Sequence, residues 1–206
     1  KKGLIITHKM TDEIGQKLLK GAKVLLMPDS TEFVKDQVGG LFMTDYWNYR
    51  MFKTICESNK KAVSPGTLGI LTNPEHPIFN YFPTEMHTNW QWFPIIKESH
   101  PAILDNLGKE YRPIVQVIDN IERNHKLGLI FEFQIGKGKL LICMSDLEKT
   151  TKYPEGRAFY ESIMRYMHSD KFCPNTHLSD INALKTMLQQ KLENKNMDKL
   201  NNISQY

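Results

Sequence analysis

Apolar and polar positions at the start of the chain predict a strand, a helix and a second strand. Residues 3–8, GLIITH, form a short β-branched run that is typical of a strand. Residues 9–21, KMTDEIGQKLLKG, carry apolar side chains at helical spacing, with Thr11 as a candidate N-cap and Gly21 as a stop signal. Residues 22–29, AKVLLMPD, are almost entirely apolar and predict the next strand. The three segments together predict a βαβ unit.

Continuous apolar strands are typical of a parallel sheet that is covered on both faces, so this start predicts a doubly wound fold. Three further strand patterns, RPIVQVID, KLGLIFEFQI and GKLLICMSDL, follow one another between residues 112 and 147. A Gly-Lys-Gly turn joins the last two and predicts a hairpin. We therefore expect a three-layer α/β domain with a mostly parallel sheet and a C-terminal antiparallel hairpin.

The pattern changes again toward the end of the chain. Residues 153–169 have the apolar spacing of an amphipathic helix. Past Pro174 the sequence is polar and rich in Asn, Lys and Gln, with one helix expected near residues 179–194. These patterns predict an α/β domain over residues 1–174 and a polar helical tail over residues 175–206.

Composition narrows the classes of function. The chain has 206 residues, of which 40% are hydrophobic, and a net charge of +4 with its basic residues scattered among acidic ones. That scatter argues against a nucleic-acid partner, and no apolar run approaches the roughly 20 residues needed to span a bilayer. The sequence opens KKGLIITHKMTDE, without an initiator Met and with a strand almost at once, so we expect a fragment of a longer polypeptide.

Most candidate reactive groups have a structural explanation. Cys143 lies in LLICMSDL, whose bulky neighbours do not suit a nucleophile elbow, so a buried, inert thiol is expected. Ser145 and Asp146 end this strand, where ligand crevices form in α/β sheets, but an N-cap role is the simpler expectation. The three cysteines form no CxxC and the seven histidines form no HxH or HExxH pattern, so neither a metal site nor a cofactor is expected.

Two islands of mixed polar and aromatic residues carry the remaining chemistry. They are FPTEMHTNWQWFPI, residues 82–95, and QVIDNIERNHKLGLIFEF, residues 116–133. A glycosidase needs two carboxyl groups roughly 5 to 9.5 Å apart, and Glu85 with Asp119 or Glu122 could supply them. Trp90 and Trp92 could stack on a sugar ring.

A structural explanation for the same islands stays open beside this one. Asp119 and Asn120 directly follow a strand, and DNIERN resembles a hydrogen-bonded turn with an Arg–carboxylate pair such as Glu122–Arg123. The two tryptophans could equally cover a sheet edge or face another domain.

Three long segments resemble the C-terminal region of long bacterial enzymes of glycoside hydrolase family 2, of the β-galactosidase-like kind. They are GLFMTDYWNYRMF, PGTLGILTNPEHPIFNYFPTEMHTNWQWFPI and RPIVQVIDNIERNHKLGLIFEFQIGKGKLLICMSDL, and the resemblance covers about residues 20 to 173. It implies a flavodoxin-like or class I glutamine-amidotransferase-like accessory module, in a periplasmic or extracellular protein. The family's catalytic glutamates belong to a separate barrel, and Cys143 lacks the elbow of an amidotransferase, so no catalytic residue is carried over.

We therefore expect a non-catalytic accessory domain whose partners are the catalytic domain of the same polypeptide, an oligosaccharide and a second copy of the chain. The alternatives are a self-contained glycoside hydrolase and a stand-alone carbohydrate-binding module. The residues expected to converge at one end of the sheet, as a carbohydrate-binding surface or an interface, are Asp45, Trp47, Asn48, Glu85, His87, Asn89, Trp90, Trp92, Asp119, Asn120, Glu122, Arg123, Asn124 and His125.

Overall fold

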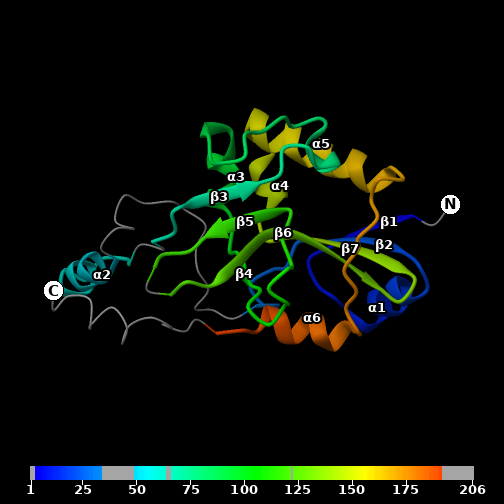
Figure 1. The fold of residues 1–206 in the computed structure, drawn as a ribbon, viewed down its shortest axis with the longest axis horizontal. Coiled ribbons are helices and arrows are strands. Elements are labelled where there is room, and N and C mark those ends of the chain that lie inside the picture. Colours follow the sequence, from blue (N-terminus) through cyan, green and yellow to red (C-terminus); the bar gives the residue numbers. More distant parts are fainter. Residues whose placement is uncertain (1–2, 34–48, 64–65, 122, 192–206) are drawn as a thin grey trace.

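The computed structural model of the chain describes residues 3–33, 49–63, 66–121 and 123–191 (Figure 1). Within them, seven strands form one mixed sheet in the order β1-β2-β7-β6-β5-β3, and β4 pairs with β6 outside this path. The strands are β1 (Leu4–Thr7), β2 (Lys23–Leu26), β3 (Gly69–Thr72), β4 (Ala102–Ile103), β5 (Val115–Ile118), β6 (Lys126–Ile135) and β7 (Gly138–Cys143). The helices are α1 (Asp12–Leu19), α2 (Tyr49–Ser58), α3 (Phe93–Lys97), α4 (Leu147–Thr150), α5 (Pro154–His168) and α6 (Ile181–Leu188), with 3-10 turns η2 (Pro77–Phe79) and η3 (Trp90–Trp92).

The predicted βαβ unit is confirmed. β1 and β2 are parallel neighbours, and α1 connects them. The Thr11 hydroxyl accepts a hydrogen bond from the Ile14 amide at 3.3 Å, which caps the first turn of the helix. Gly21 has a φ of 107°, the left-handed conformation that commonly ends a helix.

The prediction of a mostly parallel, flavodoxin-like or glutamine-amidotransferase-like sheet is wrong. Only the β1–β2 and β2–β7 pairs are parallel, whereas β6 pairs antiparallel with β7, β5 and β4, and β3 pairs antiparallel with β5. The loops that join β5 to β6 and β6 to β7 are too short for the crossover that a parallel pair needs. The fold is α/β in the general sense, with a parallel part and a larger antiparallel part.

The β6–β7 hairpin is present, but it lies in the middle of the sheet because β7 also pairs with β2. Two residues, Gly136 and Lys137, join its strands. Gly136 has a φ of 57°, and a Cβ there would lie 2.9 Å from the Leu19 carbonyl oxygen. Only glycine therefore fits this turn against the end of α1.

Helices cover both faces of the sheet, as Figure 1 shows, with α3, α4 and α5 on one side and α1 and α6 on the other. α5 agrees closely with the helix predicted over residues 153–169. α6 is shorter than predicted, and it buries Leu184, Met187 and Leu188. Its Ile181 side chain lies against Gly15 of α1.

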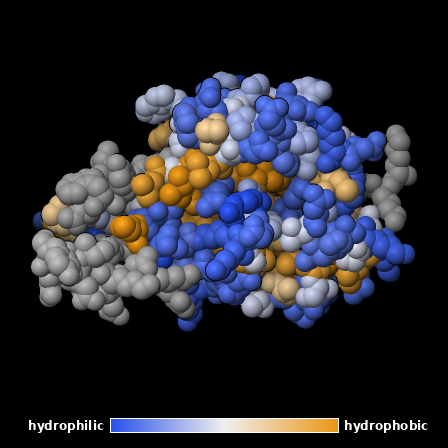
Figure 2. Space-filling model, in the orientation of Figure 1, coloured by the Kyte–Doolittle hydropathy of each residue, from blue (hydrophilic) through white to orange (hydrophobic). Residues whose placement is uncertain are grey.

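β3 forms one edge of the sheet and leaves apolar side chains uncovered. Leu71 of β3 is 46% exposed, and Leu68, just before it, is 41% exposed. Figure 2 shows apolar atoms gathered on this face, over the region where β3 and β5 lie in Figure 1. No helix in the described part of the chain is long and apolar enough to cross a membrane.

Candidate functional site

The structure separates the two tryptophans of the first island. Asn89 caps η3 by accepting a hydrogen bond from the Gln91 amide. In that short turn the Trp92 side chain is fully buried and donates a hydrogen bond to the Thr84 hydroxyl at 2.8 Å. Trp90 is 86% exposed and contacts the Phe93 ring. The two indoles do not form one stacking surface.

The other residues of the first island lie along the edge of the sheet. The carbonyl oxygen of Glu85 accepts a hydrogen bond from the Thr72 hydroxyl at 2.8 Å, and His87 bridges Leu71 of β3. His87 Nδ1 lies 3.1 Å from the Thr88 carbonyl oxygen. This segment therefore acts as a partial extra strand beside β3.

The second island forms a buried turn after β5. Asp119 Oδ1 accepts hydrogen bonds from Arg123 Nε at 3.0 Å and from a terminal guanidinium nitrogen at 2.7 Å. Asp119 Oδ2 accepts a bond from the His125 amide, and Asn120 Oδ1 accepts one from the Arg123 amide. Asn124 adopts a φ of 50° within the turn. The structure thus brings Asp119, Asn120, Arg123 and His125 together as a hydrogen-bonded turn.

The carboxylate partner of Arg123 within this turn is Asp119, with side chains 5% and 1% exposed for Arg123 and Asp119 respectively. His125 Nδ1 lies 2.7 Å from Asp105 Oδ2, which extends the buried network toward the residues after β4. Asp45, Trp47, Asn48 and Glu122, the remaining predicted site residues, lie outside the described residues.

A first hollow lies at the carboxyl ends of the three parallel-paired strands, where α/β sheets commonly bind ligands. It has a volume of about 230 Å³, and His8, Asp29, His100 and Asp146 help to line it. Two of its carboxylates, Asp29 and Asp146, have structural partners. Asp29 accepts hydrogen bonds from Thr31, which lower its pKa.

Asp146 is similarly occupied. It caps α4 through the Lys149 amide, as expected of an N-cap, and it also accepts a bond from the Lys149 ammonium group at 2.9 Å. Cys143, at the end of the same strand, is fully buried as predicted, and burial raises the pKa of its thiol to about 12. Asp29, Asp146 and Cys143 at this end of the sheet therefore serve the fold.

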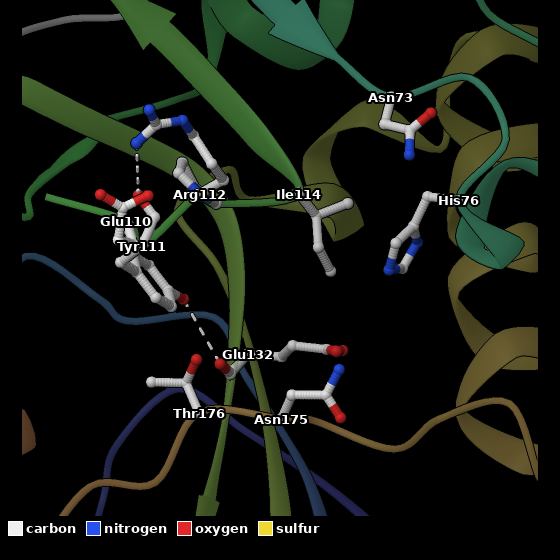
Figure 3. Close-up of a pocket in the computed structure, with 10 residues that line it drawn as sticks. Asn73, His76, Glu110, Tyr111, Arg112, Ile114, Glu132, Asn175 and Thr176 are labelled. Carbon is white, nitrogen blue, oxygen red and sulfur yellow. Dashed lines mark hydrogen bonds between the residues drawn. The ribbon is translucent and has the colours of Figure 1, made fainter. Parts of the chain in front are cut away.

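A second hollow contains a carboxyl group from a central strand of the sheet. It has a volume of about 320 Å³ and is shown in Figure 3. We call it the Glu132 pocket, and its lining includes Asn73, His76, Tyr111, Glu132, Asn175 and Thr176. Sequence analysis did not single out any of these residues.

Glu132 lies in β6, a central strand that pairs with β7 on one side and with β5 on the other. Its neighbours Phe131 and Phe133 are fully buried, and alternation along the strand directs them to the face opposite Glu132. On its own face, Glu132 Oε2 accepts a hydrogen bond from the Tyr166 hydroxyl of α5 at 2.8 Å. Burial raises the pKa of Glu132, although the Tyr166 hydrogen bond and Lys139 partly offset this effect.

His76 and Asn175 bring neutral polar groups to the same pocket. His76 Nδ1 accepts a hydrogen bond from the Ile78 amide at 3.2 Å, so the neutral ring carries its proton on Nε2. Burial lowers the pKa of His76, which favours that neutral form. Figure 3 shows the Asn175 amide beside the Glu132 carboxyl group, with both side chains extending toward the His76 side of the pocket.

Aromatic residues support the pocket from behind. The Tyr111 ring stacks on Phe133 at 5.4 Å, and its hydroxyl donates a hydrogen bond to the Glu132 carbonyl oxygen at 3.3 Å. Burial raises the pKa values of Tyr111 and Tyr166, so both hydroxyls remain hydrogen-bond donors at neutral pH. The pocket thus combines the Glu132 carboxyl group with the neutral side chains of His76, Tyr111 and Asn175, and the charged residues Glu110 and Arg112 also line it.

Comparison with known proteins assigns the chain to a family. The family model described as "Domain of unknown function (DUF8487)" matches residues 5–189. The chain belongs to this family. No curated protein matches the chain. Every residue of the Glu132 pocket falls inside the matched range, while the resemblance to glycoside hydrolase family 2 stays a prediction.

One residue of the pocket, Glu132, is conspicuous in the sequence. Glu132 is the single charged residue within the apolar strand LGLIFEFQI, and a charged residue in such a strand needs a partner or a function. His76, Tyr166 and Asn175 come from three other segments, and nothing in their sequence spacing predicts that they meet.

Among the described residues, no group of three or more His, Cys, Asp or Glu side chains could hold a metal ion.

Proposed function

We propose that this domain binds a saccharide in the Glu132 pocket and serves as a non-catalytic part of a carbohydrate-active hydrolase. The observation that carries the proposal is the Glu132 carboxyl group, which accepts a hydrogen bond from Tyr166 and lines the pocket together with the neutral polar side chains of His76 and Asn175. A carboxyl group beside an amide and an imidazole can accept and donate several hydrogen bonds to adjacent hydroxyl groups.

The size and the polarity of the pocket support this ligand class. Its volume of about 320 Å³ lies at the lower end of the roughly 300–1,000 Å³ range of small-molecule sites. Asn175 is exposed, and its side chain makes no hydrogen bond within the described chain, so its amide can bind a ligand without first breaking a bond.

The geometry gives less support to a self-contained hydrolase. Asp119, one of the two candidate partners of Glu85 in that alternative, has a side chain that is 1% exposed and is bonded to Arg123 and His125. A group so enclosed cannot reach a glycosidic oxygen. Glu132 and Glu110 both line the Glu132 pocket, and neither belongs to the carboxylate pair of that alternative.

Titration calorimetry of the domain against galactose, glucose and mannose tests the proposal. We expect one of the three sugars to bind. Asn175→Ala should weaken that binding at least fivefold, because the sugar loses the hydrogen bonds made by the oxygen and the nitrogen of the Asn175 amide. Asn106→Ala is the matched control, since Asn106 is also exposed but does not line the pocket. Equal binding to Asn175→Ala and the wild type, or no binding to any sugar, would refute the proposal.

A second measurement separates binding from catalysis. The domain is incubated with aryl-glycosides of the sugar that binds. The proposal requires no release of the aryl group, and turnover that Glu132→Gln abolishes would show instead that the pocket is an active site.

A further inference from the structure

A third hollow lies close to the Glu132 pocket, because residues that line the two are in contact. It has a volume of about 470 Å³, and Pro77, Asn80, Tyr81, Arg165, Tyr166 and Lys171 help to line it. His76, which lines the Glu132 pocket, and Tyr166, which lines the third hollow, have ring centroids 5.3 Å apart. Tyr166 lines the third hollow, and its hydroxyl donates a hydrogen bond to Glu132, which lines the Glu132 pocket.

Tyr81 presents an aromatic ring at this third hollow. Tyr81 is 55% exposed, so its ring is accessible to a ligand. The guanidinium carbon of Arg165 lies 4.4 Å from the centre of the Tyr81 ring, and Glu161 holds Arg165 through a hydrogen bond of 2.6 Å. The ring is therefore supported on one side by a cation.

The backbone at Tyr81 is also fixed. The Tyr81 amide donates a hydrogen bond to the hydroxyl of Ser162 at 3.2 Å, and that buried hydroxyl donates to the Ile78 carbonyl oxygen at 2.5 Å. Ser162 belongs to α5, so the loop that carries Tyr81 is tied to the same helix as Arg165 and Tyr166. The exposed ring has a defined position relative to the Glu132 pocket.

We propose that the two hollows are successive subsites of one cleft, and that the ligand is an oligosaccharide of at least two units. One unit occupies the Glu132 pocket and the next stacks on Tyr81. The apolar face of a pyranose ring suits an aromatic surface, whereas its hydroxyl groups suit Glu132, His76 and Asn175. This inference rests on the proposed saccharide function. It adds that the ligand has at least two sugar units and that Tyr81 binds the second one.

The experiment compares ligand lengths. Galactose, β-1,4-linked galactobiose and galactotriose are titrated into the wild type, with the corresponding glucose and mannose series in parallel. We expect affinity to rise roughly tenfold from the monosaccharide to the trisaccharide of the series that binds. Tyr81→Ala should abolish this rise and leave monosaccharide affinity unchanged, while Tyr81→Phe should retain it.

Tyr153→Ala is the matched control. Tyr153 is also partly exposed, at 37%, and has the Lys152 ammonium group 5.1 Å from its ring centre, but it precedes the opposite end of α5. The variant should behave like the wild type with every ligand.

The outcomes distinguish this inference from the proposed function. Monosaccharide binding that depends on Asn175 but does not strengthen with chain length overturns the two-subsite cleft alone. The same holds if Tyr81→Ala weakens all lengths equally. Absence of binding by every sugar overturns both.

Discussion

Trp90 and Trp92 are separated by one residue, yet the Trp90 side chain is 86% exposed and the Trp92 side chain is fully buried. The short turn η3 directs them to opposite environments. Trp92 packs among Phe79, Phe82 and Phe159, with ring centroids between 5.1 and 6.1 Å from its own. It is a core residue on the α5 side of the sheet, and Trp90 belongs to the surface.

This pair predicts two very different alanine variants. Trp92→Ala should lower the free energy of unfolding by about 3–5 kcal/mol, because it leaves a cavity among the rings and removes the bond to Thr84. Trp90→Ala should change it by about 0.5 kcal/mol or less. Urea unfolding followed by circular dichroism measures both, and similar losses in the two variants would contradict the assignment.

The buried Asp119–Arg123 pair predicts a large effect from removing the carboxylate. Asp119→Ala leaves the buried guanidinium group without this counter-charge and should cost about 3–5 kcal/mol in the free energy of unfolding. Glu161 and Arg165 form a control pair with the same four-residue spacing but side chains 58% and 53% exposed. Glu161→Ala should cost about 1 kcal/mol or less. Chemical denaturation of both variants tests the contrast, which fails if their losses are equal.

Glu132 predicts a pH dependence of stability. Its pKa is raised in the folded protein, so the folded state binds the proton more tightly than the unfolded chain does. The favourable contribution is complete below the unfolded pKa, about 4.3, and is lost as the pH rises through the folded value. Each tenfold difference in proton affinity corresponds to about 1.4 kcal/mol.

Glu132→Gln should flatten this part of the profile, since glutamine does not titrate and can still accept the Tyr166 hydrogen bond. Urea unfolding of the wild type and the variant at intervals from pH 4 to pH 7 provides the measurement. Glu13→Gln is a control with the opposite sign, because Lys17 lowers the pKa of Glu13. Parallel profiles for Glu132→Gln and the wild type would show that Glu132 does not titrate as described.

Local signals were sufficient for several elements of the fold. Thr11 and Gly21 correctly bounded α1, and the turn at Gly136 correctly indicated the β6–β7 hairpin. These predictions succeeded because caps and tight turns depend on residues that are close in sequence. The thiol of Cys143 was correctly expected to be buried for a similar reason.

Strand direction was not predictable from the same signals. Helices cover both faces of this sheet, so β2 and β7 are apolar on both faces, although β2 has only parallel neighbours and β7 also pairs antiparallel with β6. Continuous apolar strands indicate burial on two faces, and they indicate a parallel sheet only by association. The short β5–β6 connection was the better guide to direction.

The Glu132 pocket was missed for a different reason. Its polar groups come from the loop before η2, from β6, from α5 and from residues 175–176, and only the sheet brings them together. The two polar and aromatic islands were predicted as the site because their residues are adjacent in sequence. Adjacent residues in a short turn point in different directions, as Trp90 and Trp92 do.

The two-residue turn between β6 and β7 has a consequence for the chemistry of a pocket that it does not touch. Glu132 pairs with Leu141 across the hairpin, and successive side chains of a strand face opposite sides. One inserted residue at Gly136–Lys137 would slip β6 by one position and exchange Glu132 for a phenylalanine on the pocket side. The length of the β6–β7 loop thus determines which side chain of β6 faces the pocket. Loop length is therefore the quantity to compare when judging whether another member of this family has the same pocket.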